Sequence, residues 1–198
     1  MTLYIATNNA HKVGELKALF PDVDLAIPRD AGIEFDYEEN EETFLGNSLG
    51  KARALYSRLN APVLADDSGL CVDALDGAPG VKSARYGSPD GGATKLSTLE
   101  RNSYLLRSMR GAANRACRFV CAISLMLSPD RFFVAQETCE GRLLEEPRGE
   151  GGFGYDPLFL LPELGLSMAE LSAGQKNKLS HRGRAAARIR LILTSLYA

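Results

Sequence analysis

A pair of long β-like segments near the middle of the chain constrains the fold most. Residues 116–127 (ACRFVCAISLML) and 131–141 (RFFVAQETCEG) are rich in apolar, β-branched and aromatic side chains, and only Ser128, Pro129 and Asp130 separate them. Two such runs with so short a connection predict a β-hairpin, because only antiparallel strands can be joined by a tight turn. The sheet of this protein is therefore not purely parallel.

The N-terminal region predicts that helices alternate with the strands. The apolar run TLYIAT (2–7) is followed by a polar turn and by AHKVGELKALF, in which Val13, Leu16, Leu19 and Phe20 share one helical face. A strand that feeds a helix through a tight turn is the opening unit of an α/β fold. The further elements that we expect are short strands at 23–27 and 33–37, helices at 42–59, 94–110 and the C-terminal segment, and a long irregular loop at 76–93.

Size and charge limit the classes of function. A chain of 198 residues fits a single domain, 1–198. The formal net charge of −2 gives no broad basic surface, which argues against a nucleic acid polymer as partner. The chain opens without a basic and apolar leader and contains no run long enough to span a membrane, so we expect a cytoplasmic protein with no membrane partner.

Two adjacent carboxylates, Asp66 and Asp67, follow the apolar residues 63–65. Like charges side by side repel, and each loses hydration in apolar surroundings, so backbone N–H groups, a basic partner or a divalent ion must compensate them. Ser68 and Gly69 follow, and this composition predicts a sharp turn at the end of a strand. Clustered carboxylates suit Mg²⁺, whereas the plain alternative is a turn with exposed aspartates.

Two polar segments nearer the N-terminus have a functional and an ordinary interpretation. The turn from Thr7 to Lys12 (TNNAHK) combines hydroxyl, amide and ammonium groups with the N-terminus of a helix, which is a cradle for phosphate or a plain helix cap. The acidic run from Asp36 to Glu42 (DYEENEE) is a solvated face or the source of one further metal ligand.

Two segments nearer the C-terminus also have two interpretations. The glycine-rich GEGGFGYDP, residues 149–157, is a flexible loop that stacks on a base or a simple turn between strands. Lys176, His181 and Arg182 surround the start of the last helix. Basic groups there oppose the helix dipole, which indicates an anionic or oxygen-rich ligand, or else they are simply solvated.

Five stretches of the chain together resemble the inosine triphosphate pyrophosphatase family, also called XTP/dITP diphosphatases. They are IATNNAHKVGEL, TFLGNSLGKA, LADDSGLCVDALDGAPGVKSARY, GGFGYDPLF and SHRGRA. The resemblance implies an α/β fold with an elongated mixed central sheet flanked by helices, two lobes with a nucleotide cleft between them, and a homodimer. It also implies Mg²⁺-dependent hydrolysis of the non-standard purine nucleoside triphosphates ITP, dITP and XTP to the monophosphate and pyrophosphate, which cleanses the nucleotide pool.

The resemblance assigns roles by motif. Asp67 corresponds to the catalytic acid–base residue. The substrate-binding positions are Thr7, Asn8, Asn9, Ala10, His11, Lys12, Ser68, Phe153, Gly154, Tyr155, Asp156, Lys176, His181 and Arg182. The acidic metal ligand maps to Glu38 or Glu39, of which we favour Glu39, so that Mg²⁺ is expected on Asp66, Asp67 and Glu39.

The mechanism expected from these residues is attack of water on the α-phosphorus. Asp67 would orient the water and accept its proton, with a pKa raised by repulsion from Asp66. Phe153 would stack on the base, and Arg182 or His181 would donate to O6 of hypoxanthine or xanthine, which adenine lacks.

The chain departs from the family pattern at two positions. Asn8 stands where the family often has glycine, and Gly46 stands where it commonly has glutamate. The second change shifts the metal role to Glu39, Glu41 or Glu42. Two alternatives therefore stay open: a pyrophosphatase for pyrimidine or other modified nucleotides, and a catalytically silent nucleotide-binding module.

Overall fold

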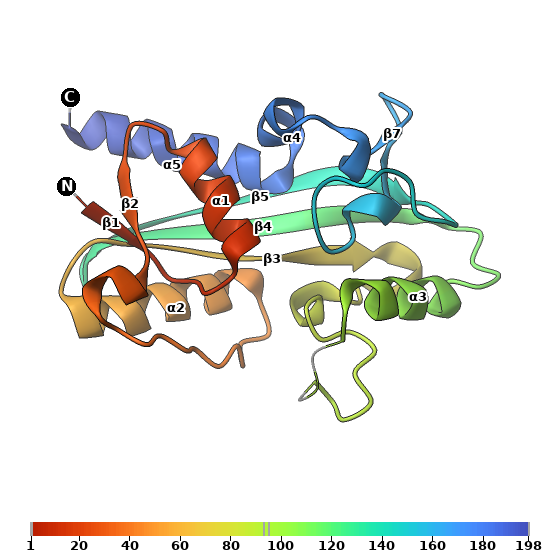
Figure 1. The fold of residues 1–198 in the computed structure, drawn as a ribbon, viewed down its shortest axis with the longest axis horizontal. Coiled ribbons are helices and arrows are strands. Elements are labelled where there is room, and N and C mark those ends of the chain that lie inside the picture. Colours follow the sequence, from red (N-terminus) through yellow and green to blue (C-terminus); the bar gives the residue numbers. More distant parts are fainter. Residues whose placement is uncertain (1, 93, 95, 198) are drawn as a thin grey trace. The chain divides into compact units, whose positions relative to one another are not determined.

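The computed structural model describes residues 2–92, 94 and 96–197. Its strands are β1 Thr2–Ile5, β2 Asp24–Ala26, β3 Val63–Val72, β4 Ala116–Ser128, β5 Arg131–Leu143, β6 Phe159–Leu161 and β7 Leu166–Ser167. Its α-helices are α1 Ala10–Leu19, α2 Phe44–Leu59, α3 Thr98–Ser108, α4 Ala173–Leu179 and α5 His181–Tyr197 (Figure 1). Only two residues separate β4 from β5, and the two strands are neighbours in the sheet, so the predicted hairpin is confirmed.

The strands form one seven-stranded mixed sheet in the order β2-β1-β3-β4-β5-β6-β7. β1 pairs in parallel with β2 and β3, whereas β6 pairs antiparallel with β5 and β7. The mixed α/β fold expected from the sequence is therefore confirmed. The chain divides into two compact units, which we call unit 1 (1–67, 121–137 and 181–198) and unit 2 (68–120 and 138–180).

Unit 1 has helices on both faces of its part of the sheet. Figure 1 shows α1 and α5 on one face and α2 on the other. Alternation along β3 produces this division, because successive side chains of a strand point to opposite faces. Leu64 packs in a cluster with α1 and α5, whereas Val63 and Ala65 pack in a second cluster with α2. Both clusters are buried, so β3 has no solvent-facing side here.

Unit 2 has its own core, and the long irregular loop that follows β3 borders it. Leu70 and Val72 of β3 pack there with Leu105 of α3 and with Phe119 of β4, whose ring centroid lies 4.4 Å from that of Phe159. Residues 76–92 form an irregular connection with a short 3₁₀ turn, in agreement with the predicted loop at 76–93, of which residue 93 lies outside the described residues. Helix α3 is shorter than the predicted span of 94–110, within which residue 95 lies outside the described residues.

Two local predictions are wrong. Asp66, Asp67 and Ser68 form no turn, because β3 continues through them to Val72 and buries both carboxylates. Residues 33–37 are extended but join no strand. Their alternating pattern comes from packing on α2, so a period of two does not by itself identify a sheet strand.

The described helices were also compared with the requirements of a membrane span. None of them combines the necessary length with sufficient apolar character.

Candidate active site

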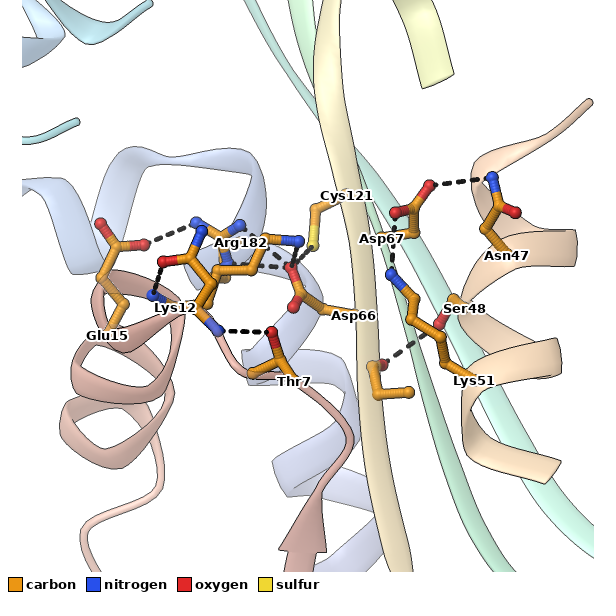
Figure 2. Close-up of polar contacts among 12 residues, drawn as sticks. Thr7, Lys12, Glu15, Asn47, Ser48, Lys51, Asp66, Asp67, Cys121 and Arg182 are labelled. Carbon is orange, nitrogen blue, oxygen red and sulfur yellow. Dashed lines mark hydrogen bonds and ion pairs between the residues drawn. The ribbon is translucent and has the colours of Figure 1, made fainter. Parts of the chain in front are cut away.

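Asp66 and Asp67 lie on opposite faces of β3. Figure 2 shows the Asp66 carboxylate on the side of α1 and α5, and the Asp67 carboxylate on the side of α2. Their exposed fractions are 1% and 4%. Each carboxylate has its own cationic partners, which resolves the electrostatic problem that the sequence posed. A single metal ion shared by both carboxylates does not fit this arrangement.

Asp66 is compensated by protein cations. Its Oδ2 lies 3.2 Å from Lys12 Nζ, and it accepts hydrogen bonds from Arg182 Nε at 3.2 Å and Nη2 at 3.0 Å. Arg182 also donates from Nη1 to Glu15 at 2.6 Å. Burial works to raise the pKa of Asp66, but Lys12 and Arg182 outweigh it and hold that pKa below its ordinary range. Asp66 is therefore an ionised anchor for basic side chains.

Asp67 belongs to a separate group of charges on the α2 side. Lys51 Nζ donates to Asp67 Oδ1 at 2.9 Å and to Glu39 Oε1 at 2.8 Å, so one buried ammonium group holds two carboxylates. Asn47 Nδ2 lies 3.5 Å from Asp67 Oδ2. Burial raises the pKa of Asp67 against the attraction of Lys51, and Glu39 adds to the increase. The expected main cause was repulsion from Asp66, whereas the largest cause is burial.

The Glu39 and Asp67 carboxylates have the chemistry of a magnesium site. Mg²⁺ prefers oxygen ligands and commonly takes one or two carboxylates from protein, with water and substrate phosphate as the others. Among the described residues, no cluster of three or more His, Cys, Asp or Glu side chains could hold an ion. A two-carboxylate set completed by phosphate fits both facts. Glu39, which contacts Lys51, suits this role better than the exposed Glu38.

The polar turn before α1 is shaped by its own cap. The Asn9 side chain accepts from the backbone N–H groups of His11 at 3.0 Å and Lys12 at 3.3 Å. Two N–H groups that the sequence offered to phosphate are thus already bonded. Asn8 donates to the Phe35 carbonyl oxygen, which ties this turn to the extended segment before α2.

A second polar group lies in unit 2, around the glycine-rich loop. Asp156 Oδ2 accepts from Lys176 Nζ at 2.6 Å and from the Phe153 backbone N–H at 2.7 Å, and Lys176 Nζ lies 4.8 Å from the Phe153 ring centroid. Gly152 has a φ of +70°, and a Cβ there would lie 2.1 Å from Asp156 Oδ2. Only glycine permits this loop, which fixes one aromatic ring beside a carboxylate and an ammonium group.

Helix α3 fixes the same loop through Asn102. Its Nδ2 donates to the Gly154 carbonyl oxygen at 3.2 Å, and the residue is buried. We expect Asn102→Ala to destabilise the protein by about 1–2 kcal/mol, since it leaves the partly buried Gly154 carbonyl oxygen without this donor. Urea unfolding would measure the change against Asn177→Ala, which makes the same substitution on helix α4. Equal stability of the two variants would contradict a tethering role for Asn102.

The comparisons with known proteins decide the family. The chain matches the Ham1 family over residues 3–191. It belongs to this family. A dITP/XTP pyrophosphatase of Treponema denticola is 49% identical over 185 residues, which cover 93% of this chain and 94% of that protein. The dITP/XTP pyrophosphatase of Treponema pallidum is 48% identical over 99% of this chain and 72% of its own length.

Solved structures agree with this assignment. The Staphylococcus aureus Ham1 protein is 36% identical, with a TM-score of 0.87 over 98% of this chain and 99% of that one. A dITP/XTP pyrophosphatase structure from Mycobacterium abscessus is 33% identical, with a TM-score of 0.76 over 96% and 98% of the two chains. The family resemblance recognised from the sequence motifs is confirmed.

Within this Ham1 chain, the predicted site residues fall into separate places. The remaining ones are Thr7 in the turn before α1, Ala10 and His11 in the first turn of α1, Ser68 in β3, Gly154 and Tyr155 in the glycine-rich loop, and His181 at the start of α5. His181 is 5% exposed, and the guanidinium of Arg182 contacts two carboxylates of unit 1. Because its guanidinium is already bonded to these carboxylates, Arg182 is better suited to holding Asp66 in place than to donating to a base.

Sequence reasoning missed four residues that the structure brings to these groups. They are Glu15, Asn47, Lys51 and Asn102. Asn47 and Lys51 lie within a stretch that resembles the family, TFLGNSLGKA, and are one helical turn apart. That spacing places them on one face of α2, which was the available signal for a polar group facing the sheet.

Proposed function

We propose that this Ham1 protein hydrolyses the non-standard purine nucleoside triphosphates dITP, XTP and ITP to the nucleoside monophosphate and pyrophosphate, with Mg²⁺. The observation that carries the proposal is the buried Asp67 carboxylate, held with Glu39 on one Lys51 ammonium group. Relatives named dITP/XTP pyrophosphatase, up to 49% identical over most of both chains, support the same substrates. When bound, Mg²⁺ would neutralise phosphate charge and stabilise the leaving pyrophosphate.

Asp67 is suited to the proton transfer that this reaction needs. The oxygen of a water molecule bonds to the α-phosphorus, the bond from that phosphorus to the bridging oxygen breaks, and pyrophosphate leaves. Asp67 takes the proton of the attacking water. Lys51 holds Oδ1 at 2.9 Å, whereas Asn47 lies farther from Oδ2, at 3.5 Å, so Oδ2 is the oxygen placed to accept the proton. The raised pKa of Asp67 makes it a stronger base than an ordinary aspartate.

The other groups have roles in binding. Lys12, whose side chain is 14% exposed, and the turn before it would hold the phosphate chain. Phe153 offers a ring for stacking on a base, and Lys176 beside it offers a donor for the O6 atom of hypoxanthine or xanthine. Adenine presents an amino group in place of O6, and a donor directed at that position rejects it.

Removal of metal and exchange of the base test the proposed function directly. We expect pyrophosphate release from dITP, ITP and XTP with Mg²⁺, a loss of activity on chelation and its return when Mg²⁺ is restored. The kcat/KM for ATP should be lower by up to about 10⁴-fold, because a donor aimed at O6 then meets an amino group.

The same panel separates the rival functions. Preference for pyrimidine or other modified nucleotides would make the chain a different pyrophosphatase. Binding of dITP without pyrophosphate release, with or without Mg²⁺, would make it a silent binding module. Association as a homodimer stays a prediction from the family resemblance, and a cytoplasmic location stays a prediction from the sequence.

A further inference from the structure

An extended segment before α2, residues 33–41, lies along that helix without joining the sheet. We call it the acidic segment. Its odd-numbered side chains Phe35, Tyr37 and Glu39 are buried or half-buried, whereas the even-numbered residues between and beside them are exposed. The segment therefore presents every second side chain to the protein, as a strand does, although its partner is a helix.

Three residues of the acidic segment contact α2. The backbone of Glu41 is held by Asn47, which accepts from its N–H at 3.1 Å and donates to its carbonyl oxygen at 3.2 Å. Glu39 is held by Lys51. Tyr37 lies against Gly50, the residue that directly precedes Lys51. These three contacts fasten the segment to the first turns of α2.

The contact between Tyr37 and Gly50 exists only because residue 50 has no side chain. A Cβ at Gly50 would lie 2.0 Å from Tyr37 Oη and 2.8 Å from its Cζ, distances that real Cβ atoms essentially never show. Glycine inside a helix is less favourable than alanine, so this position sacrifices helix propensity for a close approach. The phenol fills the notch that Gly50 leaves on α2.

The position of the Tyr37 ring in this notch limits the positions that Glu39 can adopt. Only one residue separates Tyr37 from Glu39, so a displaced ring would carry the Glu39 backbone with it. The Glu39 carboxylate is the more exposed of the two held by Lys51, with a side-chain exposure of 31% against 6% for Asp67. Glu39 therefore depends on its own segment for its position, whereas Asp67 is fixed by the sheet.

We propose that Tyr37, seated in the notch of Gly50, is a positioning residue that holds Glu39 beside Asp67 and thereby sets the affinity of the site for a divalent cation. The proposal rests on the proposed function for the use of the cation, but the geometry is that of the chain itself. In this arrangement the second carboxylate comes from the acidic segment, so the site needs no glutamate at position 46 of α2.

Two variants disturb this contact from opposite sides. Gly50→Ala adds a methyl group where the phenol lies, and Tyr37→Ala removes the phenol and introduces no clash. The matched control is Gly14→Ala on α1, because a Cβ at Gly14 would meet nothing within 4 Å. All three variants are compared as the full-length chain, and the folded fraction of each is measured by thermal unfolding.

Two measurements without nucleotide decide the role of Tyr37. Binding of Mn²⁺, an oxygen-preferring probe for the Mg²⁺ site, is expected to weaken by about 10-fold in both Tyr37→Ala and Gly50→Ala, as for other lost supports of metal ligands. Hydrogen exchange at the Glu41 amide, which is bonded to Asn47, is expected to accelerate by about 10-fold in both. Gly14→Ala should leave both quantities at the wild-type value.

The same measurements can overturn the proposal. Wild-type Mn²⁺ affinity and Glu41 exchange in Tyr37→Ala would show that the phenol is only packing, and so would a loss of Mn²⁺ binding that follows the unfolded fraction alone. If Gly50→Ala folds poorly, Glu41 exchange in Tyr37→Ala still reports the position of the segment, because Tyr37→Ala introduces no clash. Absence of pyrophosphate release by the wild-type protein would overturn the proposed function and leave the exchange result standing.

Discussion

Asp67→Asn is expected to lower kcat for dITP by about 10²–10⁴-fold, the usual contribution of a general base. Asparagine has the shape of aspartate and keeps an oxygen for the Lys51 ammonium group at 2.9 Å, so the protein should stay folded. It cannot accept a proton from water, and it provides no charge for a metal ion. The KM for dITP should change by much less than kcat, because the proposed function assigns the phosphate and base contacts to other residues.

Steady-state pyrophosphate release at saturating Mg²⁺ and at several higher concentrations measures this effect. A matched control is Asp22→Asn, since the side chain of Asp22 is 85% exposed and lies in the same unit. Recovery of most activity at high Mg²⁺ would show that Asp67 acts chiefly as a metal ligand. Turnover near the wild-type value would remove Asp67 from the chemistry altogether.

Local periodicity predicted the main elements of the fold. The helical spacing of apolar residues placed α2 within two residues of its observed start, and the short connection at 129–130 gave the β4–β5 hairpin. These features depend on neighbours in sequence, where the physical preferences of helices and tight turns are strong. The mixed sheet followed from combining the hairpin with the strand–turn–helix at the N-terminus.

The error at residues 66–69 has a non-local cause. Two aspartates and a glycine are typical of a turn, but here β3 is buried on both faces and continues through them. Asp66 is tolerated because Lys12 and Arg182 reach it from 54 residues before and 116 residues after it in the chain. No local pattern encodes such partners. The compensation by basic groups was one of three possibilities that the sequence left open.

Sequence motifs identified part of the candidate site, but the residues whose role depends on packing could not be identified from the sequence. The motif resemblance pointed to Asp67 and Glu39, which the structure brings to one ammonium group. Lys51, which provides that group, resembles a solvated helical lysine in the sequence and is recognised only through its burial at 5% exposure. Likewise, the notch at Gly50 depends on Tyr37, thirteen residues away, and has no signature in either residue alone.

Arg182→Met is expected to destabilise the protein by about 3–5 kcal/mol, the usual loss when one partner of a buried ion pair is removed. Arg182 is 2% exposed, and its guanidinium contacts both Asp66 and Glu15. The variant leaves the Asp66 carboxylate buried beside the Lys12 ammonium group, whose Nζ lies 3.2 Å from Oδ2. Urea unfolding at neutral pH gives the difference, and Arg190→Met on the half-exposed side of the same helix is the control.

Acid provides a second check on the same ion pair. Because the pKa of Asp66 is lowered in the folded state, its charge stabilises the fold above the ordinary pKa of aspartate, about 4, and this stabilisation is lost as the pH falls below that value. The gap in stability between wild type and Arg182→Met should therefore shrink in acid. The double variant Asp66→Asn/Arg182→Met should lose less than the sum of the two single variants, since the two groups contact each other.

The mechanism expected from the sequence has a different role for Arg182 or His181, as the donor to O6 of the base. That role predicts a protein of nearly wild-type stability that no longer distinguishes dITP from ATP. The buried contacts with Asp66 predict the reverse: a large loss of stability, with discrimination kept in the fraction that folds. Measuring both quantities on Arg182→Met thus separates support of the phosphate side of the site from recognition of the base, because each role changes a quantity that the other leaves alone.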